Sequence, residues 1–194
     1  MKSEITDRRR FQVIDAMMLV AATAPGLILL RVADNSKLFT FDPRTGRGMQ
    51  FLEFMAVAGG CVLVPMAFAV LVAGLCDRRT TRSEVVQGTG FISCLAVVVA
   101  ANYAFAWFLV KLATVSELDL DLEKAIQFNN FFGRVKFLAG PMILGAWLAL
   151  AMTGRLRSPT WIDRLGVFIG LGFVLLYLMH ELFHFVQPLL SLVR

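Results

Sequence analysis

Three residues near the end of the chain have the types and the spacing needed for metal chemistry. His180, Glu181 and His184 lie within five positions, and the two histidines are the only ones in the chain. Residues four apart are neighbours on a helix, so both imidazoles can bind one metal ion while the glutamate acts on a metal-bound water. The spacing therefore predicts a zinc site, with His180 and His184 as ligands and Glu181 as general base.

This H-E-x-x-H pattern resembles the motif of zinc metallopeptidases, which implies Zn²⁺ as the cofactor and hydrolysis as the reaction. Those families take the third ligand from downstream of the motif, where this chain has no Asp, Glu or His. Glu53, at the start of an earlier apolar segment, is the candidate third ligand. The resemblance covers five residues, so alternatives stay open. The motif also belongs to a polar helix stripe that could hydrogen-bond to neighbouring helices or meet lipid headgroups: Tyr177, His180, Glu181, His184 and Gln187.

The elements that must position these residues are apolar helices. Of the 194 residues, 58% are hydrophobic and 17% charged, against about a quarter charged in soluble domains. The hydrophobic residues form long blocks separated by short charged segments, which is typical of a polytopic membrane protein. The sequence predicts an all-α transmembrane helix bundle, one membrane domain over 1–194, with about five spans at 11–30, 51–76, 91–112, 137–152 and 163–190.

Residues at or near the ends of these hydrophobic blocks predict side-chain positions, a helix cap and an additional helix. Arg134 and Lys136 precede the short fourth block, and we expect both side chains to reach the headgroups. Thr160 and Asp163 have the spacing of a capping box at the start of the fifth helix. Apolar residues share one face of 117–128, which predicts an interfacial amphipathic helix there.

The formal net charge of +5 has a membrane explanation. The basic residues cluster at the ends of apolar blocks, as membrane anchors do, and do not alternate with aromatic residues as in a nucleic-acid interface. The expected partner is the lipid bilayer, with no nucleic acid; association through membrane helices, with itself or with another protein, stays open. The three cysteines show no C-x-x-C spacing, so neither a disulfide nor a zinc knot is expected.

The opening of the chain bears on location. Arg9-Arg10-Phe11-x-x-x-Asp15-x-Met17 and the apolar run after it resemble the first helix of small uncharacterised bacterial multi-span membrane proteins. That resemblance implies the bacterial inner membrane. Arginine clusters at 8–10 and 78–82 predict a cytoplasmic N-terminus and, with five spans, a C-terminus outside.

Two classes of function remain open at this level. One is an intramembrane zinc-dependent hydrolase or peptidase that uses the motif residues. The other is a non-catalytic structural or partner-binding membrane subunit, in which the polar stripe joins helices.

The topology can be measured with reporter fusions. A reporter placed after residue 80 should report the cytoplasm and one placed at Arg194 the opposite side, because an odd number of spans follows the cytoplasmic N-terminus. Both reporters on one side would refute the five-span count. Opposite but reversed reporters would refute the orientation.

Overall fold

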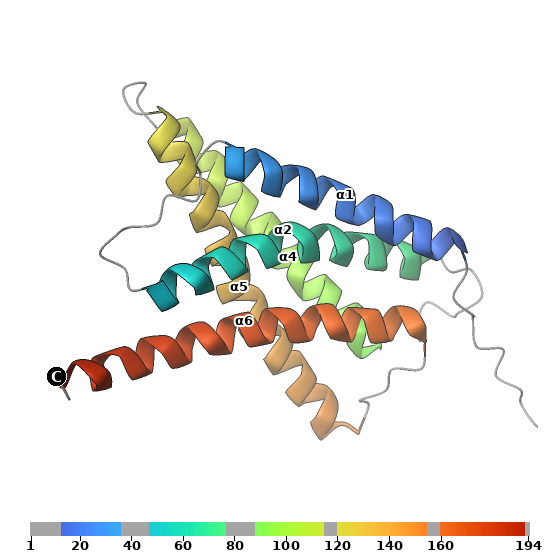
Figure 1. Cartoon of the computed structure of the whole chain (residues 1–194). Helices are drawn as coiled ribbons and strands as arrows, with labels where there is room; N and C mark the ends of the chain where they lie inside the picture. Colours follow the sequence, from blue (N-terminus) through green and yellow to red (C-terminus); the bar gives the residue numbers. More distant parts are fainter. Residues whose placement is uncertain (1–12, 36–46, 77–87, 115–119, 155–159, 193–194) are drawn as a thin grey trace, which may run out of the picture.

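The computed structural model describes residues 13–35, 47–76, 88–114, 120–154 and 160–192. These residues form five helices and no strand (Figure 1). The helices are α1 (Val13–Asn35), α2 (Arg47–Cys76), α4 (Thr89–Thr114), α5 (Leu120–Met152) and α6 (Trp161–Leu192). The all-α prediction is therefore confirmed.

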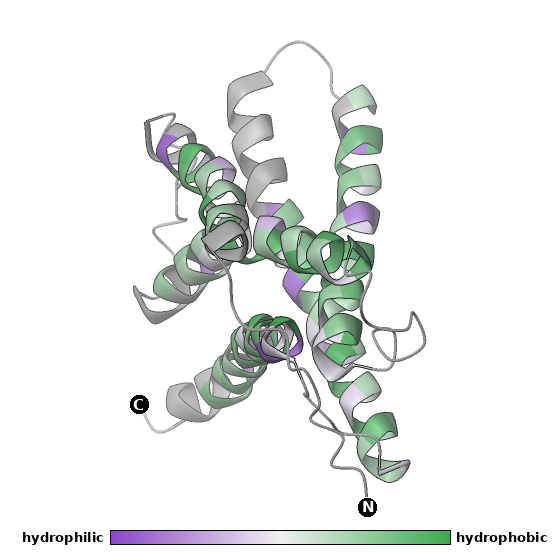
Figure 2. Ribbon diagram, turned by 90° about the vertical axis from the view of Figure 1, so that its right-hand side faces the viewer, coloured by the Kyte–Doolittle hydropathy of each residue, from purple (hydrophilic) through white to green (hydrophobic). Residues whose placement is uncertain are grey.

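Four of the helices are long and apolar enough to cross a membrane. The candidate spans are Glu53–Cys76, Thr89–Lys111, Asn130–Met152 and Trp161–Val186. Large hydrophobic side chains lie on the outside of the bundle, where Met152 is 82% exposed, Phe168 74% and Phe185 71%. The hydropathy colouring in Figure 2 shows that the helices consist mostly of hydrophobic residues. Such a surface is stable in contact with lipid and not in water. The chain is a multi-pass helical membrane protein.

The helices differ from the predicted segments in two respects. The helix predicted over 117–128 and the span predicted over 137–152 are, from Leu120 onward, parts of the single helix α5. The first predicted span, 11–30, overlaps α1, which is not among the four candidate spans. The count of five spans therefore stays a prediction. Prolines 25, 65 and 141 lie inside α1, α2 and α5.

The bundle has a continuous apolar core between α2, α4, α5 and α6. In Figure 1, α1, α2 and α6 run roughly side by side, while α4 and α5 cross behind α2 and α6. The side chains at the centre are almost fully enclosed, among them Val97, Val135, Ile143, Ile169 and Phe173. Within the described residues α1 packs against α2 alone. The two helices meet at Gly26, where a Cβ atom would lie 2.2 Å from the carbonyl oxygen of Cys61.

The tightest contact between two helices joins the beginnings of α4 and α6. A Cβ atom on Gly90 would lie 1.8 Å from the carbonyl oxygen of Asp163, and one on Gly166 would lie 2.4 Å from the carbonyl oxygen of Gly90. The two backbones therefore touch, which only glycine permits.

Asp163 stabilises this junction through its side chain. Its Oδ1 accepts hydrogen bonds from the backbone N–H groups of Gly90, at 2.6 Å, and Phe91, at 3.3 Å. These N–H groups belong to the first turn of α4 and have no partner inside that helix. Asp163 thus caps a helix that begins 73 residues earlier in the chain.

The predicted capping box at the start of α6 is half formed. Thr160 Oγ1 accepts a hydrogen bond from the backbone N–H of Asp163 at 3.1 Å, as such a box requires. The Asp163 side chain does not complete the box, because it is bonded to α4 instead.

We expect Asp163→Ala to lower the free energy of unfolding by about 2 kcal/mol, since it removes two hydrogen bonds at a buried helix end. Asp163→Asn should cost less, because its carbonyl oxygen can still accept from Gly90. Unfolding in mixed detergent and SDS measures both. The control is Arg164→Ala, an exposed neighbour that should change stability by less than ~0.5 kcal/mol. Equal stability of Asp163→Ala and Arg164→Ala would contradict the capping role.

Candidate functional site: an ionisable cluster at one end of the bundle

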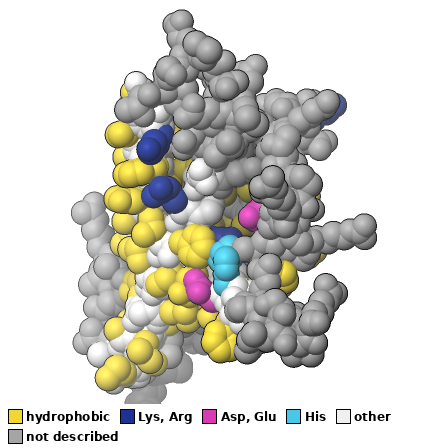
Figure 3. All heavy atoms as spheres, turned by 90° about the vertical axis from the view of Figure 1, so that its left-hand side faces the viewer, with side chains coloured by type: hydrophobic (Ala, Val, Ile, Leu, Met, Phe, Trp, Pro, Cys, Tyr) yellow, Lys and Arg dark blue, Asp and Glu magenta, His cyan; other side chains and the backbone are white. Residues whose placement is uncertain are grey.

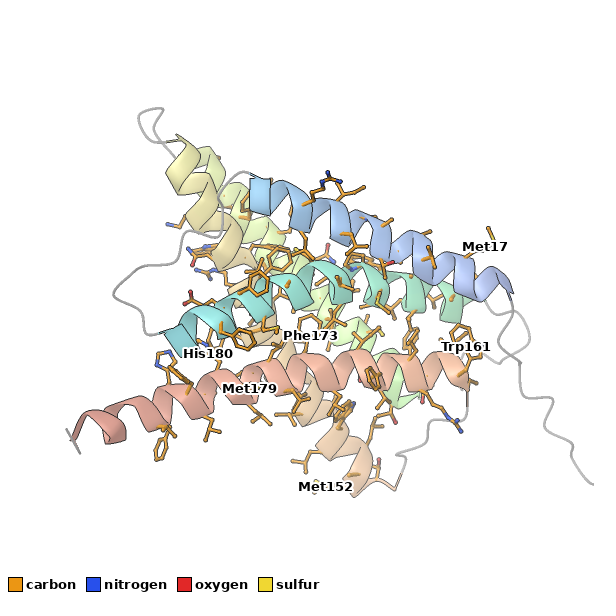
Figure 4. The ribbon with its side chains drawn as sticks, viewed as in Figure 1. Met17, Met152, Trp161, Phe173, Met179 and His180 are labelled. Atoms are coloured by element: carbon orange, nitrogen blue, oxygen red, sulfur yellow. The ribbon has the colours of Figure 1, made fainter. Side chains whose placement is uncertain are left out.

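The motif residues lie in the second half of α6, away from the α4–α6 junction. In Figure 4 the label Trp161 marks the start of α6, at the junction, and the label His180 marks the position of the motif. The helix is continuous from Trp161 to Leu192, so His180 and His184 lie on one face as the spacing predicted. Their imidazole ring centroids are 4.7 Å apart.

His180 is bonded to a lysine from another helix. The Nζ atom of Lys136, on α5, lies 3.1 Å from Nδ1 of His180. Both side chains are buried: Lys136 is 3% exposed and His180 8%. The expectation that Lys136 reaches the headgroups is therefore wrong. Its side chain turns inward, because an ammonium group within a span is more stable against a polar partner than against lipid.

Aromatic side chains enclose this contact. The Phe137 ring meets the ring of His180 edge to face at 4.7 Å and that of Tyr177 at 6.3 Å. Lys136 Nζ lies 5.1 Å from the centre of the same Phe137 ring. Gly140 allows Tyr177 to approach α5, because a Cβ there would lie 2.6 Å from the Tyr177 Cβ. Two residues of the polar stripe, Tyr177 and His180, therefore pack directly against α5.

Two carboxylates complete the cluster. Glu53, near the start of α2, and Glu181, on α6, are exposed and carry the charge opposite to that of Lys136. Figure 3 shows histidine and acidic side chains together on this end of the molecule, bordered by hydrophobic side chains. Of the sequence-predicted site residues, His180, Glu181 and His184 therefore lie together on α6, whereas Glu53 lies on α2.

Within the described parts of the chain, no three His, Cys, Asp or Glu side chains are grouped so that they could hold a metal ion. The zinc site therefore stays a prediction.

Sequence reasoning missed Lys136 as a site residue, although a signal for it exists. Lys136 lies six residues inside the candidate span Asn130–Met152, deeper than Arg134. A basic side chain at that depth needs a polar partner, and the polar stripe of the last helix is the obvious source of one.

The comparisons with known proteins give no match for this chain. No family model matches it, and neither a curated protein nor a solved structure is similar enough to it to carry an inference.

A double-mutant cycle tests the central contact. Lys136→Met and His180→Leu should each destabilise the bundle, and the pair should be coupled by about 0.6–1.7 kcal/mol, the range of hydrogen bonds between membrane helices. Unfolding in detergent and SDS gives the four free energies. Arg134→Met, combined with His180→Leu, is the matched control and should show no coupling, because Arg134 lies against Trp107 on α4. Additive effects of Lys136→Met and His180→Leu would contradict the contact.

Proposed function

We propose that this chain is a non-catalytic membrane subunit in which the H-E-x-x-H residues hold helices together and do not form a hydrolytic centre. The observation that carries this proposal is the 3.1 Å contact between Lys136 Nζ and His180 Nδ1 across α5 and α6. It uses the polar stripe of α6 as an interhelical link, which is how membrane bundles satisfy buried polar groups.

The positions of the protons in the contact between Lys136 and His180 oppose zinc binding by His180. A charged lysine can only donate, so Nδ1 of His180 must accept. A neutral imidazole that accepts at Nδ1 carries its proton on Nε2 and has no lone pair there for a metal. The positive charge of Lys136 also repels a dication at this distance. Zinc binding would therefore require the link between α5 and α6 to open.

The second candidate function is the zinc-dependent hydrolase. It is favoured by the proximity of the two imidazole rings, at 4.7 Å, and by the presence of Glu53 and Glu181 in the same cluster. In that case His180, His184 and Glu53 would hold the metal, and Glu181 would act on a bound water.

The proposed location is the bacterial inner membrane, with the N-terminus in the cytoplasm. The arginine clusters at 8–10 and 78–82 support this orientation. The described helices are consistent with it, because α1 and α2 form an antiparallel pair in which the start of α1 and the end of α2 lie toward the same side (Figure 1).

Zinc content separates the two functions. Protein purified without chelator should carry no stoichiometric zinc, and added zinc should leave its melting temperature unchanged, because nothing in the folded state binds the ion. Elemental analysis and thermal unfolding in detergent measure these two quantities.

The opposite result identifies the hydrolase. About one zinc per chain, lost in both His180→Ala and His184→Ala, would refute the subunit proposal. Glu181→Gln then separates the roles: a general base can be removed without loss of metal, whereas a ligand cannot. Glu53→Gln tests the third ligand in the same assay.

A further inference from the structure

Helix α4 has a row of exposed side chains on the side that faces away from the bundle core. Its inner side is fully enclosed at Cys94, Val97 and Ala104, each of which is 0% exposed. The exposed row, called the outer seam below, lies about half a turn further around the helix. It consists of five residues: Leu95, Val99, Asn102, Ala106 and Leu109.

The spacing of the outer seam is that of a helix-pairing surface. Its members follow one another at intervals of four, three, four and three positions, which is the heptad pattern of two helices packed side by side. Such a row runs straight along the helix and fits a second helix at a small left-handed crossing angle. Ala106 is small, so the two backbones can approach next to Asn102.

Asn102 lies near the middle of the membrane. In the candidate span Thr89–Lys111 its distance along the helix axis is ~20 Å from the first residue and ~14 Å from the last, at about 1.5 Å per residue. An apolar core ~30 Å thick therefore has this amide close to its centre. Polar side chains at that depth face other protein groups, because lipid chains offer no hydrogen-bond partner.

The amide of Asn102 retains hydrogen-bonding capacity for such a partner. Its Nδ2 atom donates to the backbone carbonyl oxygen of Val98 at 2.8 Å. A side-chain amide has a second N–H group and an oxygen that can accept. Within the described residues Asn102 makes no other hydrogen bond, and its side chain is exposed. One donor and one acceptor therefore point away from the bundle.

A second copy of this chain is the partner that matches this surface. Copies inserted in the same orientation have parallel α4 helices, so a two-fold axis along the membrane normal brings their Asn102 residues together at equal depth. Two facing amides are self-complementary, because each Oδ1 can accept from the Nδ2 of the other. The outer seam contains no charged residue that would repel its copy. A different protein would need a polar group at this same depth, which a second copy always supplies.

We propose that the outer seam of α4 is the interface of a parallel homodimer, in which the Asn102 side chains of the two copies form hydrogen bonds with each other. This interface lies on the opposite side of α4 from the core and does not depend on the function proposed above.

Förster transfer between donor- and acceptor-labelled full-length chains in phosphatidylcholine vesicles measures the association. Asn102→Leu should weaken the dimer about tenfold, because it removes two interhelical hydrogen bonds from each dimer. Asn102→Gln should retain most of the affinity, since the amide is kept. The matched control is Tyr103→Phe, which removes a hydroxyl group from the neighbouring exposed residue and should leave the affinity unchanged.

Unfolding of the monomer in detergent separates association from folding. Asn102→Leu should not lower the stability of the monomer, because the side chain lies outside the core. A destabilised monomer would show that Asn102 acts within the single chain and would overturn the proposal. So would association that is unchanged in Asn102→Leu, or equally weakened in Tyr103→Phe.

Cross-linking tests the geometry of the interface in the same vesicles. In a Cys76→Ser background, which removes the exposed native thiol, Val99→Cys and Ala106→Cys should each give disulfide-linked dimers on mild oxidation. Leu175→Cys, exposed on α6 near the middle of its span, is the control and should stay monomeric. Equal cross-linking at all three positions would indicate random collision and contradict the proposal. Thiols at 99 and 106 that form no dimer, or that cross-link in cells only to a different protein, would overturn it as well.

Discussion

The carboxyl group of Asp163 holds together the end of the bundle at which α4 and α6 begin. It supplies the acceptor that the first turn of α4 lacks, and the glycine pair Gly90 and Gly166 lets the two backbones come close enough for the bond to form. In a membrane an unpaired N–H group is costlier than in water, since no solvent replaces the missing partner. The relative position of α4 and α6 is therefore determined here, and α5 packs against both helices. Next to the junction, Trp147 of α5 donates a hydrogen bond to Ser93 of α4 at 2.8 Å.

Buried polar groups are hydrogen-bonded in different ways at the two ends of the bundle. At the α4–α6 junction a side chain satisfies backbone groups. At the other end Lys136 and His180 satisfy each other, with carboxylates nearby. Between the two ends the interior consists of apolar side chains such as Phe173 and Val97, which fit together by shape alone. The polar contacts therefore determine the alignment of helices that the apolar contacts leave free to slide.

Sequence patterns predicted the helices well and their contacts poorly, for a physical reason. A run of about 20 hydrophobic residues is what a helix needs to cross the membrane, so hydropathy alone identifies such segments. Four of the predicted spans accordingly overlap candidate spans of the structure. The motif also predicted correctly that the two histidines lie on one face of a helix, and their ring centroids are 4.7 Å apart. The partner of His180 was not predictable from spacing, because Lys136 is 44 positions away and its side chain could equally have extended toward the headgroups. The sequence predicted that Asp163 would cap the start of its own helix, α6. Its side chain caps α4 instead, and that contact depends on tertiary packing.

The bond between Asp163 and Gly90 also has a consequence for biosynthesis. A chain grows from its N-terminus, so α4 is synthesised 73 residues before the carboxyl group that caps it. At 5–20 residues per second this interval lasts about 4–15 s. During that time the first N–H groups of α4 must be satisfied by water or headgroups, which keeps this end of the helix near the surface of the bilayer. Only when α6 inserts can the start of α4 move into its final place, so this junction of the bundle is completed only after the segment that carries Asp163 has been made.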